Sequence, residues 1–290
     1  MSILAEIKTE LNQLGIAPKK SLGQNFLINE GIYKKIIAAA EIQKGGMVIE
    51  VGPGLGTLTQ FLLDADAEIL AIEKDRQLAE YLKTKFAAEK HVKIIEDDIL
   101  NFDPKRWMLN AKRFKVVGNI PYYLTSHLLK IIFEKWSRSP SDRGSSTKSG
   151  PQPELIVLMI QKEVAQRIVA EPPNMNLLAV SIQYYAKAEI AGTVSRGSFW
   201  PQPKVDSAII KVAPKTEIPE AVETERFFRV LKAGFSGTRK QLINTLSGGL
   251  KLPREIVNSR LLSLGIATQR RAETLTLDEW QNIATTLLPR

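Results

Sequence analysis

Short apolar runs alternate with helical patterns through the middle of this chain of 290 residues, and the alternation restricts its fold more than any other feature of the sequence. The predicted strands cover residues 47–51, 68–72, 92–95, 114–117 and 155–160. The helices predicted between them cover residues 58–63, 75–88, 125–136 and 162–170. Strands and helices that alternate at this spacing form a mostly parallel sheet with helices on both faces. We therefore predict an α/β fold of this kind.

Further patterns flank the alternating region. Helical spacing is found at residues 3–14, directly before Gly15, and again at residues 29–40, where Asn29 is a suitable N-cap. Two later strand-like runs, at residues 179–185 and 207–212, predict a closing pair of strands.

The chain changes character after Pro214. Apolar residues recur at helical spacing in residues 224–234, 238–246, 253–264 and 277–288. We therefore predict an α/β domain over residues 1–214 and a small all-α domain over residues 215–290. Residues 137–153 are rich in Ser, Pro, Gly and basic residues, which predicts a flexible insertion without a core of its own.

Composition limits both the chemistry and the partners. The formal net charge is +9 and the pI is about 9.5, which favours a polyanionic partner such as nucleic acid, although a solvated basic surface would give the same count. The chain has no Cys and two His, which excludes disulfides and thiol nucleophiles and leaves little material for a metal site. Its apolar runs are too short to cross a bilayer, and its N-terminus lacks the pattern of a secretion signal. We expect a cytoplasmic location, no membrane partner and no metal.

Three glycines follow the first strand of the alternating region, in the segment Glu50-Val-Gly-Pro-Gly-Leu-Gly. Glycine permits a sharp turn and a close approach of the backbone to a ligand, because it has no Cβ. A dinucleotide-binding turn would need a glycine where Thr57 stands, and a phosphate-binding loop would need a Gly-Lys-Ser/Thr run, which the segment lacks. The turn at Gly52 and Gly54 therefore indicates a different ligand, unless it is only a tight connection between strand and helix.

Two carboxylates follow the next two predicted strands. Glu73 ends the second strand, and Asp98 lies just beyond the third. Because the carboxyl ends of parallel strands meet at one edge of a sheet, both side chains should lie near the glycine turn. Glu73 could accept hydrogen bonds from both ribose hydroxyls of a nucleoside, and Asp98 could accept one from an adenine amine. A nucleoside cofactor without a pyrophosphate fits this arrangement, and S-adenosylmethionine fits it best.

The segment Gly118-Asn-Ile-Pro-Tyr-Tyr follows the fourth strand. An exocyclic adenine amine is a poor nucleophile because its lone pair is delocalised into the ring. The side-chain carbonyl of Asn119 and the backbone carbonyl of Ile120 could accept hydrogen bonds from this amine and favour its attack. Pro121 would fix the backbone, and Tyr122 could stack on an extruded base. The alternative interpretation is a turn with buried aromatic rings.

A second aromatic segment, Phe199-Trp-Pro-Gln-Pro-Lys-Val-Asp, lies far along the chain. Phe199 could form the opposite wall against the extruded base, with the prolines holding the loop rigid. An aromatic cap over the hydrophobic core explains the same residues equally well.

Several segments occur together in the order typical of one family. They are Lys20-Ser-Leu-Gly-Gln-Asn-Phe-Leu, Glu50-Val-Gly-Pro-Gly-Leu-Gly, Asn119-Ile-Pro-Tyr-Tyr, Gln161-Lys-Glu-Val-Ala and Phe199-Trp-Pro-Gln-Pro-Lys-Val-Asp-Ser. Over about residues 18–250 the sequence resembles the ribosomal RNA adenine dimethylases, most closely the bacterial small-subunit (16S) branch. The resemblance implies a Rossmann-like S-adenosylmethionine-dependent methyltransferase domain. The cofactor contacts expected from it are Asn25, Leu27, Gly52, Gly54, Glu73, Lys74, Asp98, Ile99 and Asn119.

The resemblance also implies a substrate and a partner. Two adjacent adenosines near the 3′ end of 16S rRNA would each receive two methyl groups, with S-adenosylhomocysteine as the product. The expected partner is 16S rRNA within an immature 30S subunit, contacted in part by the basic helical tail, and the expected oligomeric state is a monomer. Two alternatives stay open: a 23S rRNA dimethylase of the macrolide-resistance type, and a ribosome-assembly factor that keeps the fold without catalysis.

Overall fold

The computed structural model describes residues 2–19, 23–107, 113–136, 151–216, 220–237 and 239–288. These residues form two compact units. The first contains the described residues up to 136 together with 151–165 and 189–214, and the second contains residues 166–188 and the described residues from 215 onward. Most of the predicted insertion, residues 137–150, lies outside the described residues.

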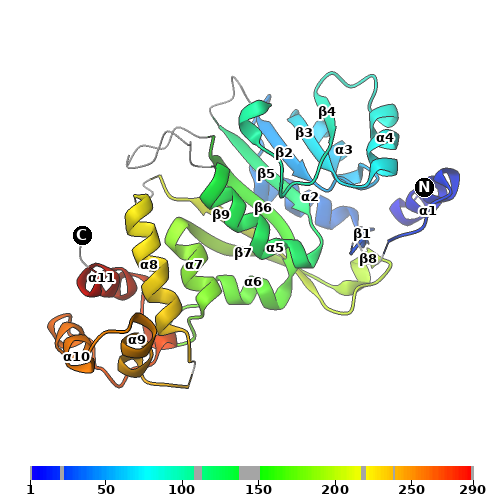
Figure 1. Ribbon diagram of the computed structural model, residues 1–290. Coiled ribbons are helices and arrows are strands. Elements are labelled where there is room, and N and C mark those ends of the chain that lie inside the picture. The colour runs from blue at the N-terminus through cyan, green and yellow to red at the C-terminus, as the bar shows by residue number, and fades with distance from the viewer. Residues whose placement is uncertain are drawn as a thin grey trace. The chain divides into compact units, whose positions relative to one another are not determined.

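A sheet of seven strands forms the centre of the first unit (Figure 1). Its strands are β2 (Met47–Val51), β3 (Glu68–Glu73), β4 (Val92–Glu96), β5 (Phe114–Asn119), β6 (Pro153–Gln161), β7 (Ala186–Val194) and β9 (Ser207–Pro214). They lie in the order β4-β3-β2-β5-β6-β9-β7; β2 to β6 pair in parallel, and β9 is antiparallel to β6. The predicted α/β class with a mostly parallel sheet is confirmed. Because the strand order reverses between β2 and β5, a ligand crevice is expected at the carboxyl ends of these strands.

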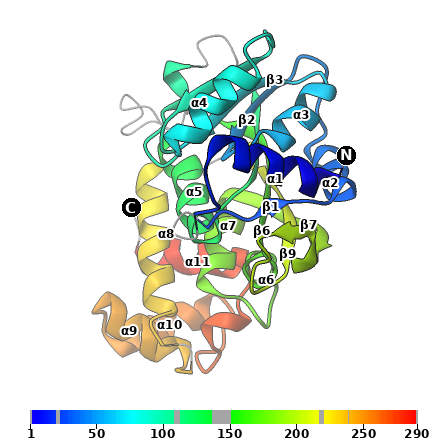
Figure 2. The ribbon, with the colours of Figure 1, turned by 90° about the vertical axis from the view of Figure 1, so that its right-hand side faces the viewer.

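Helices cover both faces of this sheet, and the side that carries α1, α3 and α4 faces the viewer in Figure 2. The helices of this unit are α1 (Ile3–Leu14), α2 (Glu30–Ala40), α3 (Thr57–Asp64), α4 (Arg76–Lys85) and α5 (Thr125–Ile131). Shorter helical turns are η2 (Pro104–Arg106), η3 (Tyr122–Leu124), η4, a π-helix (Ile132–Trp136), and η6 (Arg196–Ser198). Ile36 of α2 and Leu62 of α3 join Val48 and Val117 of the strands in one buried core cluster. This packing fixes the strand ends, which carry the predicted site.

A second, two-stranded sheet was not predicted. β1 (Phe26–Leu27) pairs antiparallel with β8 (Phe199–Trp200), so that Leu27 lies opposite Phe199. Two-residue strands carry no hydrophobic period, so the sequence pattern has no signal for them. The pairing joins the N-terminal loop to the second aromatic segment.

The strand predicted at residues 179–185 is wrong, because this segment is helix α7 (Leu177–Tyr185) and the strand follows it as β7. Its β-branched and aromatic residues favour a strand, but the tertiary environment outweighs that preference. Asn176 caps the helix by accepting a hydrogen bond from the Ala179 N–H at 3.0 Å. Tyr184 stacks on Phe227 at a ring separation of 4.1 Å, so the helix is packed in an apolar core.

The second unit is helical. It contains α7 together with α8 (Ala221–Gly234), α9 (Leu242–Leu250), α10 (Arg254–Ser263), the turn η7 (Ala272–Thr274) and α11 (Leu277–Leu287), while α6 (Lys162–Ile168) and the start of β7 cross its border. The predicted domain boundary at residues 214 and 215 therefore differs from these units in one respect. Residues 166–188 lie in the helical unit because the rings of α7 pack on α8. None of the described helices is long and apolar enough to cross a membrane.

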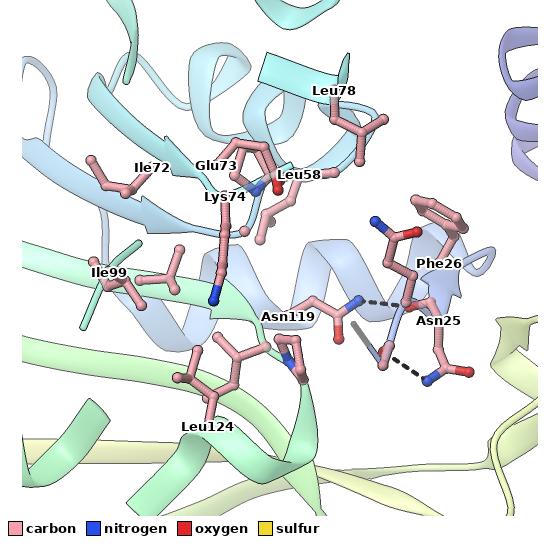
Figure 3. A pocket seen from close by; sticks show the side chains of 18 of the residues that line it. Asn25, Phe26, Leu58, Ile72, Glu73, Lys74, Leu78, Ile99, Asn119 and Leu124 are labelled. Atoms are coloured by element: carbon pink, nitrogen blue, oxygen red, sulfur yellow. Dashed lines mark hydrogen bonds between the residues drawn. The ribbon is translucent and has the colours of Figure 1, made fainter. Parts of the chain in front are cut away.

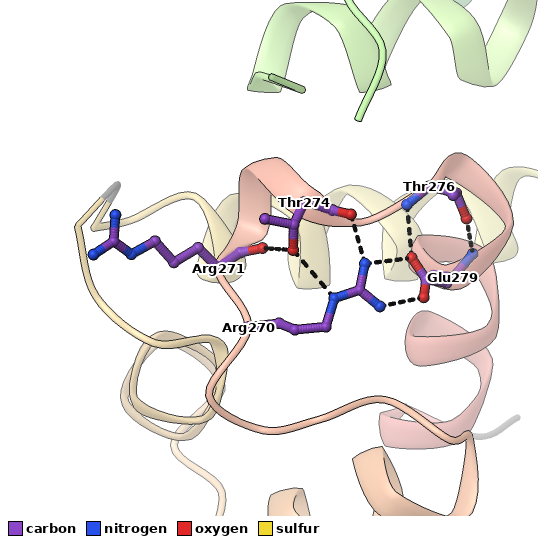
Figure 4. A network of polar contacts seen from close by, with 5 residues as sticks. All are labelled: Arg270, Arg271, Thr274, Thr276 and Glu279. Atoms are coloured by element: carbon purple, nitrogen blue, oxygen red, sulfur yellow. Dashed lines mark hydrogen bonds and ion pairs between the residues drawn. The ribbon is translucent and has the colours of Figure 1, made fainter. Parts of the chain in front are cut away.

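An arginine network holds the start of α11 (Figure 4). The guanidinium of Arg270 donates to both carboxylate oxygens of Glu279 and to the Thr274 carbonyl. Glu279 also accepts a hydrogen bond from the Thr276 N–H at 2.8 Å, and Thr276 Oγ1 accepts one from the Glu279 N–H at 3.1 Å. This capping box and its bidentate ion pair fix the direction in which α11 leaves the preceding turn.

Candidate active site

A pocket opens at the carboxyl ends of β2, β3 and β5, where the strand order reverses (Figure 3). All the predicted site residues line it: Asn25, Leu27, Gly52, Gly54, Glu73, Lys74, Asp98, Ile99, Asn119, Ile120, Pro121, Tyr122 and Phe199. Their individual roles stay predictions. The described residues contain no group of three or more His, Cys, Asp or Glu side chains that could hold a metal ion.

The glycine turn brings backbone to the floor of the pocket. Gly52 and Gly54 have φ values of 67° and 63°, a left-handed region that favours glycine. The Gly52 N–H donates to the Ile72 carbonyl at 3.0 Å, which ties the turn to the neighbouring strand. A Cβ on Gly54 would lie 3.4 Å from the ring of Phe26, so a side chain there would press on the N-terminal loop.

Glu73 is the buried acid of the pocket, with 7% of its surface exposed. One carboxylate oxygen accepts the Gly54 N–H at 3.1 Å and the other accepts the Asp75 N–H at 2.8 Å. Burial raises the pKa of Glu73, and these two backbone donors oppose the rise. Each oxygen keeps a lone pair for a ligand, since a carboxylate offers about four acceptor positions.

Asp98 lies beyond the end of β4 and pairs with Lys74. Lys74 Nζ is 2.8 Å from Asp98 Oδ2, and the Leu100 N–H donates to Asp98 Oδ1 at 3.0 Å. Partial burial acts to raise the pKa of Asp98, but the Lys74 and Leu100 donors outweigh it, so the pKa lies below its usual range. Asp98 is therefore a carboxylate at neutral pH. The apolar side chains of Ile72 and Ile99 lie together on this side of the pocket in Figure 3.

Asn119 ends β5 and turns its amide in a defined direction. Its Nδ2 donates to the backbone carbonyl of Asn25 at 3.2 Å (Figure 3). A carbonyl can only accept, so this contact assigns nitrogen and oxygen of the amide and leaves Oδ1 as an acceptor in the pocket. Gly118 permits the placement, because a Cβ there would lie 2.7 Å from the Val51 carbonyl on the adjacent strand. Asn119 therefore presents an acceptor oxygen to the pocket, and its role toward an adenine amine stays a prediction.

Tyr122 follows in the short turn η3 and is held by a long-range contact. Its hydroxyl lies 2.8 Å from the hydroxyl of Ser207 at the start of β9. The ring is partly buried, and burial raises the pKa of Tyr122 while the Ser207 hydrogen bond opposes the rise. One polar anchor thus fixes the orientation of a ring on the pocket wall.

Phe199 is more enclosed than its predicted role requires. It lines the pocket, but only 3% of its surface is exposed, and it belongs to the core cluster that contains Leu27 and Tyr33. Its proposed contact with an extruded base stays a prediction, next to its evident packing role. Sequence reasoning missed further lining residues, among them Phe26, Leu58 and Leu78, because apolar residues in these places look like ordinary core positions. Only the neighbouring Asn25 and Leu27 could have drawn attention to Phe26.

Glu50 is a second buried acid, on β2 directly before the glycine turn. None of its surface is exposed; Thr59 Oγ1 donates to one carboxyl oxygen at 2.7 Å, and the other oxygen has no hydrogen-bond partner among the described residues. Burial raises its pKa to about 8, with a smaller contribution from the charge of Glu73. Glu50 is therefore protonated at neutral pH in the folded chain.

We expect Glu50→Gln to remove a pH dependence of stability. The folded pKa of about 8 lies above the ordinary value of 4.5, so folding takes up a proton between these two pH values. The contribution of Glu50 to the free energy of unfolding is largest below pH 4.5. It falls by about 1.4 kcal/mol per pH unit between pH 4.5 and about 8. Between pH 4.5 and 7, the unfolding free energy of the wild type should fall by about 3 kcal/mol relative to that of Glu50→Gln, as measured by urea denaturation.

The exposed Glu225→Gln on α8 is the matched control, and it should follow the wild type at every pH. If the difference in unfolding free energy between wild type and Glu50→Gln stays constant with pH, Glu50 is ionised in the folded chain and its assignment here is wrong.

Comparison with known proteins identifies the family. The sequence matches the ribosomal RNA adenine dimethylase family over residues 16–288. This chain belongs to that family. It is 38% identical over 283 residues to the ribosomal RNA small subunit methyltransferase A of Dehalococcoides mccartyi, covering 97% of this chain and 92% of that protein. It is 39% identical over 271 residues to the protein of the same name from Alkaliphilus metalliredigens, covering 91% and 90%.

Two solved structures share the dimethylase fold. The 23S rRNA methyltransferase ErmE superimposes with a TM-score of 0.70 at 26% identity, covering 91% of this chain and 99% of that one. A dimethyladenosine transferase from Plasmodium falciparum also gives a TM-score of 0.70, at 25% identity, covering 89% and 95%. Since these matches cover 91% and 89% of this chain, they include the sheet and at least part of the helical unit.

Proposed function

We propose that this chain transfers methyl groups from S-adenosylmethionine to N6 of two adjacent adenosines near the 3′ end of 16S rRNA, two methyl groups to each. The observation that carries the proposal is the acceptor oxygen Asn119 Oδ1, which lies in the same pocket as the carboxylates of Glu73 and Asp98. Relatives that are 35–39% identical and named ribosomal RNA small subunit methyltransferase A support the choice of subunit.

The pocket residues suit S-adenosylmethionine. Glu73 keeps lone pairs for the two ribose hydroxyls, and Asp98 keeps lone pairs for an adenine amine. Ile72 and Ile99 offer apolar side chains of the kind that pack on an adenine ring. When bound, the cofactor supplies an electrophilic methyl group on a positively charged sulfur.

The residues after β5 would hold the acceptor amine. Asn119 Oδ1 and the Ile120 carbonyl accept hydrogen bonds from its N–H groups, which localises the lone pair on the nitrogen. Pro121 fixes the backbone that carries both acceptors, and Tyr122, anchored on Ser207, presents its ring to the extruded base. The chain needs no strong general base, because the amine loses its proton only after it has gained the methyl group. Positioning and electrostatics account for the rate enhancement.

The helical unit is proposed to bind the RNA backbone of an immature 30S subunit, with the chain acting as a monomer. Its exposed basic side chains include Arg239, Lys240, Lys251, Arg254 and Arg260. Such contacts with phosphates position a protein without reading sequence.

A methyl-transfer assay tests the proposal and separates it from its two alternatives. The purified chain is incubated with labelled S-adenosylmethionine and either immature small subunits or protein-free 23S rRNA, and the modified nucleotides are mapped by nuclease digestion and mass spectrometry. We expect N6,N6-dimethyladenosine at two adjacent positions near the 3′ end of 16S rRNA. Modification of 23S rRNA instead would favour the macrolide-resistance activity, and subunit binding without transfer would favour an assembly factor.

A further inference from the structure

Tyr123 stands at the rim of the pocket and is largely exposed. It lines the pocket, and 59% of its surface is accessible to solvent. Among the described residues, it is the only large exposed apolar or aromatic side chain that lines the pocket. The proposed function gives this ring no role, since Asn119 and Ile120 supply the acceptors and Tyr122 supplies the ring that faces the extruded base.

The two consecutive tyrosines are held differently. The Tyr122 hydroxyl contacts Ser207, whereas the Tyr123 ring is directed to solvent. The turn that carries them is closed by a hydrogen bond from the Leu124 N–H to the Pro121 carbonyl at 2.9 Å. Leu124 is buried beneath the turn. The exposed ring therefore projects from a fixed backbone, and little backbone entropy is lost when a ligand binds to it.

The neighbours of Tyr123 place it on one side of the pocket mouth. Gly23 of the N-terminal loop is a near neighbour of this ring, since a Cβ added at Gly23 would lie 3.8 Å from Tyr123 Cε1 and 3.2 Å from Pro121 Cβ. Lys74 lies within electrostatic reach of Tyr123. The ring thus lies near the loop at Gly23 and within range of the Lys74 charge, at the boundary between pocket and solvent.

An RNA base that leaves its stack for the pocket exposes the face of the base beside it. The sugar–phosphate link keeps that neighbouring nucleotide at the pocket mouth. An aromatic side chain at the mouth can replace the lost stacking partner, and such stacking accepts any base because each has a π-face.

We propose that Tyr123 forms a second nucleotide subsite, in which its ring stacks on the base directly adjacent to the adenosine in the pocket. This inference rests on the proposed function. Because the ring occupies one side of the mouth, it serves either the 5′ or the 3′ neighbour, but not both. The subsite therefore distinguishes the two flanking nucleotides of each acceptor.

The test combines protein variants with altered substrates. Small subunits are reconstituted with 16S rRNA that has one acceptor adenosine and an abasic ribonucleotide on its 5′ or its 3′ side, next to an intact control. Initial rates of methyl transfer at limiting subunit concentration give kcat/KM for wild type, Tyr123→Ala and Tyr123→Phe. In the wild type, removal of the base on one side should lower kcat/KM about 10-fold more than removal of the base on the other side. This ratio corresponds to the loss of one base–aromatic stacking contact.

In Tyr123→Ala, kcat/KM for the intact substrate should fall about 10-fold, and removal of that same base should cause no further loss. Tyr123→Phe keeps the ring and should match the wild type, and so should Trp107→Ala, which removes an exposed aromatic ring that does not line the pocket. The affinity for S-adenosylmethionine, measured by calorimetry, should be the same in all variants.

Three outcomes overturn the inference. In the first, kcat/KM of Tyr123→Ala on the intact substrate equals that of the wild type. In the second, Tyr123→Phe loses as much kcat/KM as Tyr123→Ala. In the third, removal of each flanking base lowers kcat/KM of Tyr123→Ala by the same factor as it lowers that of the wild type. In each of these cases the wild type still transfers methyl groups, so the proposed function stands. Failure of the wild type to methylate the intact subunit would reject the proposed function and this subsite with it.

Discussion

Asn119→Ala should lower kcat for methyl transfer about 10²–10³-fold, the usual effect of removing one pre-positioned polar group that stabilises a transition state. Asn119 Oδ1 is held as an acceptor because Nδ2 donates to the Asn25 carbonyl. The variant loses the acceptor that favours a nucleophilic amine, while Glu73 and Asp98 keep their positions for the cofactor. The dissociation constant of S-adenosylmethionine should rise far less than kcat falls, because Asn119 is only one of several expected cofactor contacts. Single-turnover rates and calorimetry measure the two quantities separately.

The control for Asn119→Ala is Asn12→Ala, an exposed asparagine in α1, which should leave both quantities unchanged. A loss of cofactor affinity as large as the loss of rate would show that Asn119 mainly holds the cofactor, and the acceptor role would have to be abandoned.

Glu73→Ala should raise the dissociation constant of S-adenosylmethionine at least about 100-fold. The variant removes a charged acceptor of two ribose hydrogen bonds, each worth about 1.5–3 kcal/mol, and a factor of ten corresponds to about 1.4 kcal/mol. Glu73→Gln keeps a neutral acceptor, so its dissociation constant should lie between those of Glu73→Ala and the wild type. Isothermal titration calorimetry gives the constants directly.

The same substitution also removes the acceptor of the Gly54 and Asp75 N–H groups, so the thermal midpoint has to be measured beside the affinity. Glu96→Ala is the matched control, since Glu96 also ends a strand of the sheet but is exposed and does not line the pocket. Unchanged affinity in a folded Glu73→Ala protein would remove Glu73 from the cofactor site.

Much of the fold could be predicted because strands and helices alternate with clear periods. The strands at 47–51 and 68–72 and the helix at 3–14 agree with β2, β3 and α1 to within one residue. Residues 177–185 could not be assigned correctly, because a helix that is buried on most sides and contains several β-branched and aromatic residues has the same local pattern as a strand. β1 and β8 are too short for any pattern, and only their pairing across the chain defines them.

The site could be predicted where polar side chains directly follow strands. Glu73, Asp98 and Asn119 meet because parallel strands end at one edge of the sheet. The contacts that orient the site residues could not be predicted from the sequence. Asn119 is bound by Asn25, 94 residues away, and Tyr122 is bound by Ser207, 85 residues away. No local pattern records such pairings.

A crystal structure of the chain with S-adenosylhomocysteine tests the central claim most directly, namely that one pocket holds the cofactor beside the Asn119 acceptor. We expect the ribose hydroxyls on the Glu73 carboxylate, the adenine amine near Asp98, and the sulfur facing the side of the pocket that carries Asn119 Oδ1. Two results would contradict this claim: S-adenosylhomocysteine bound outside this pocket, or an Asn119 side chain that points away from the sulfur of the bound ligand.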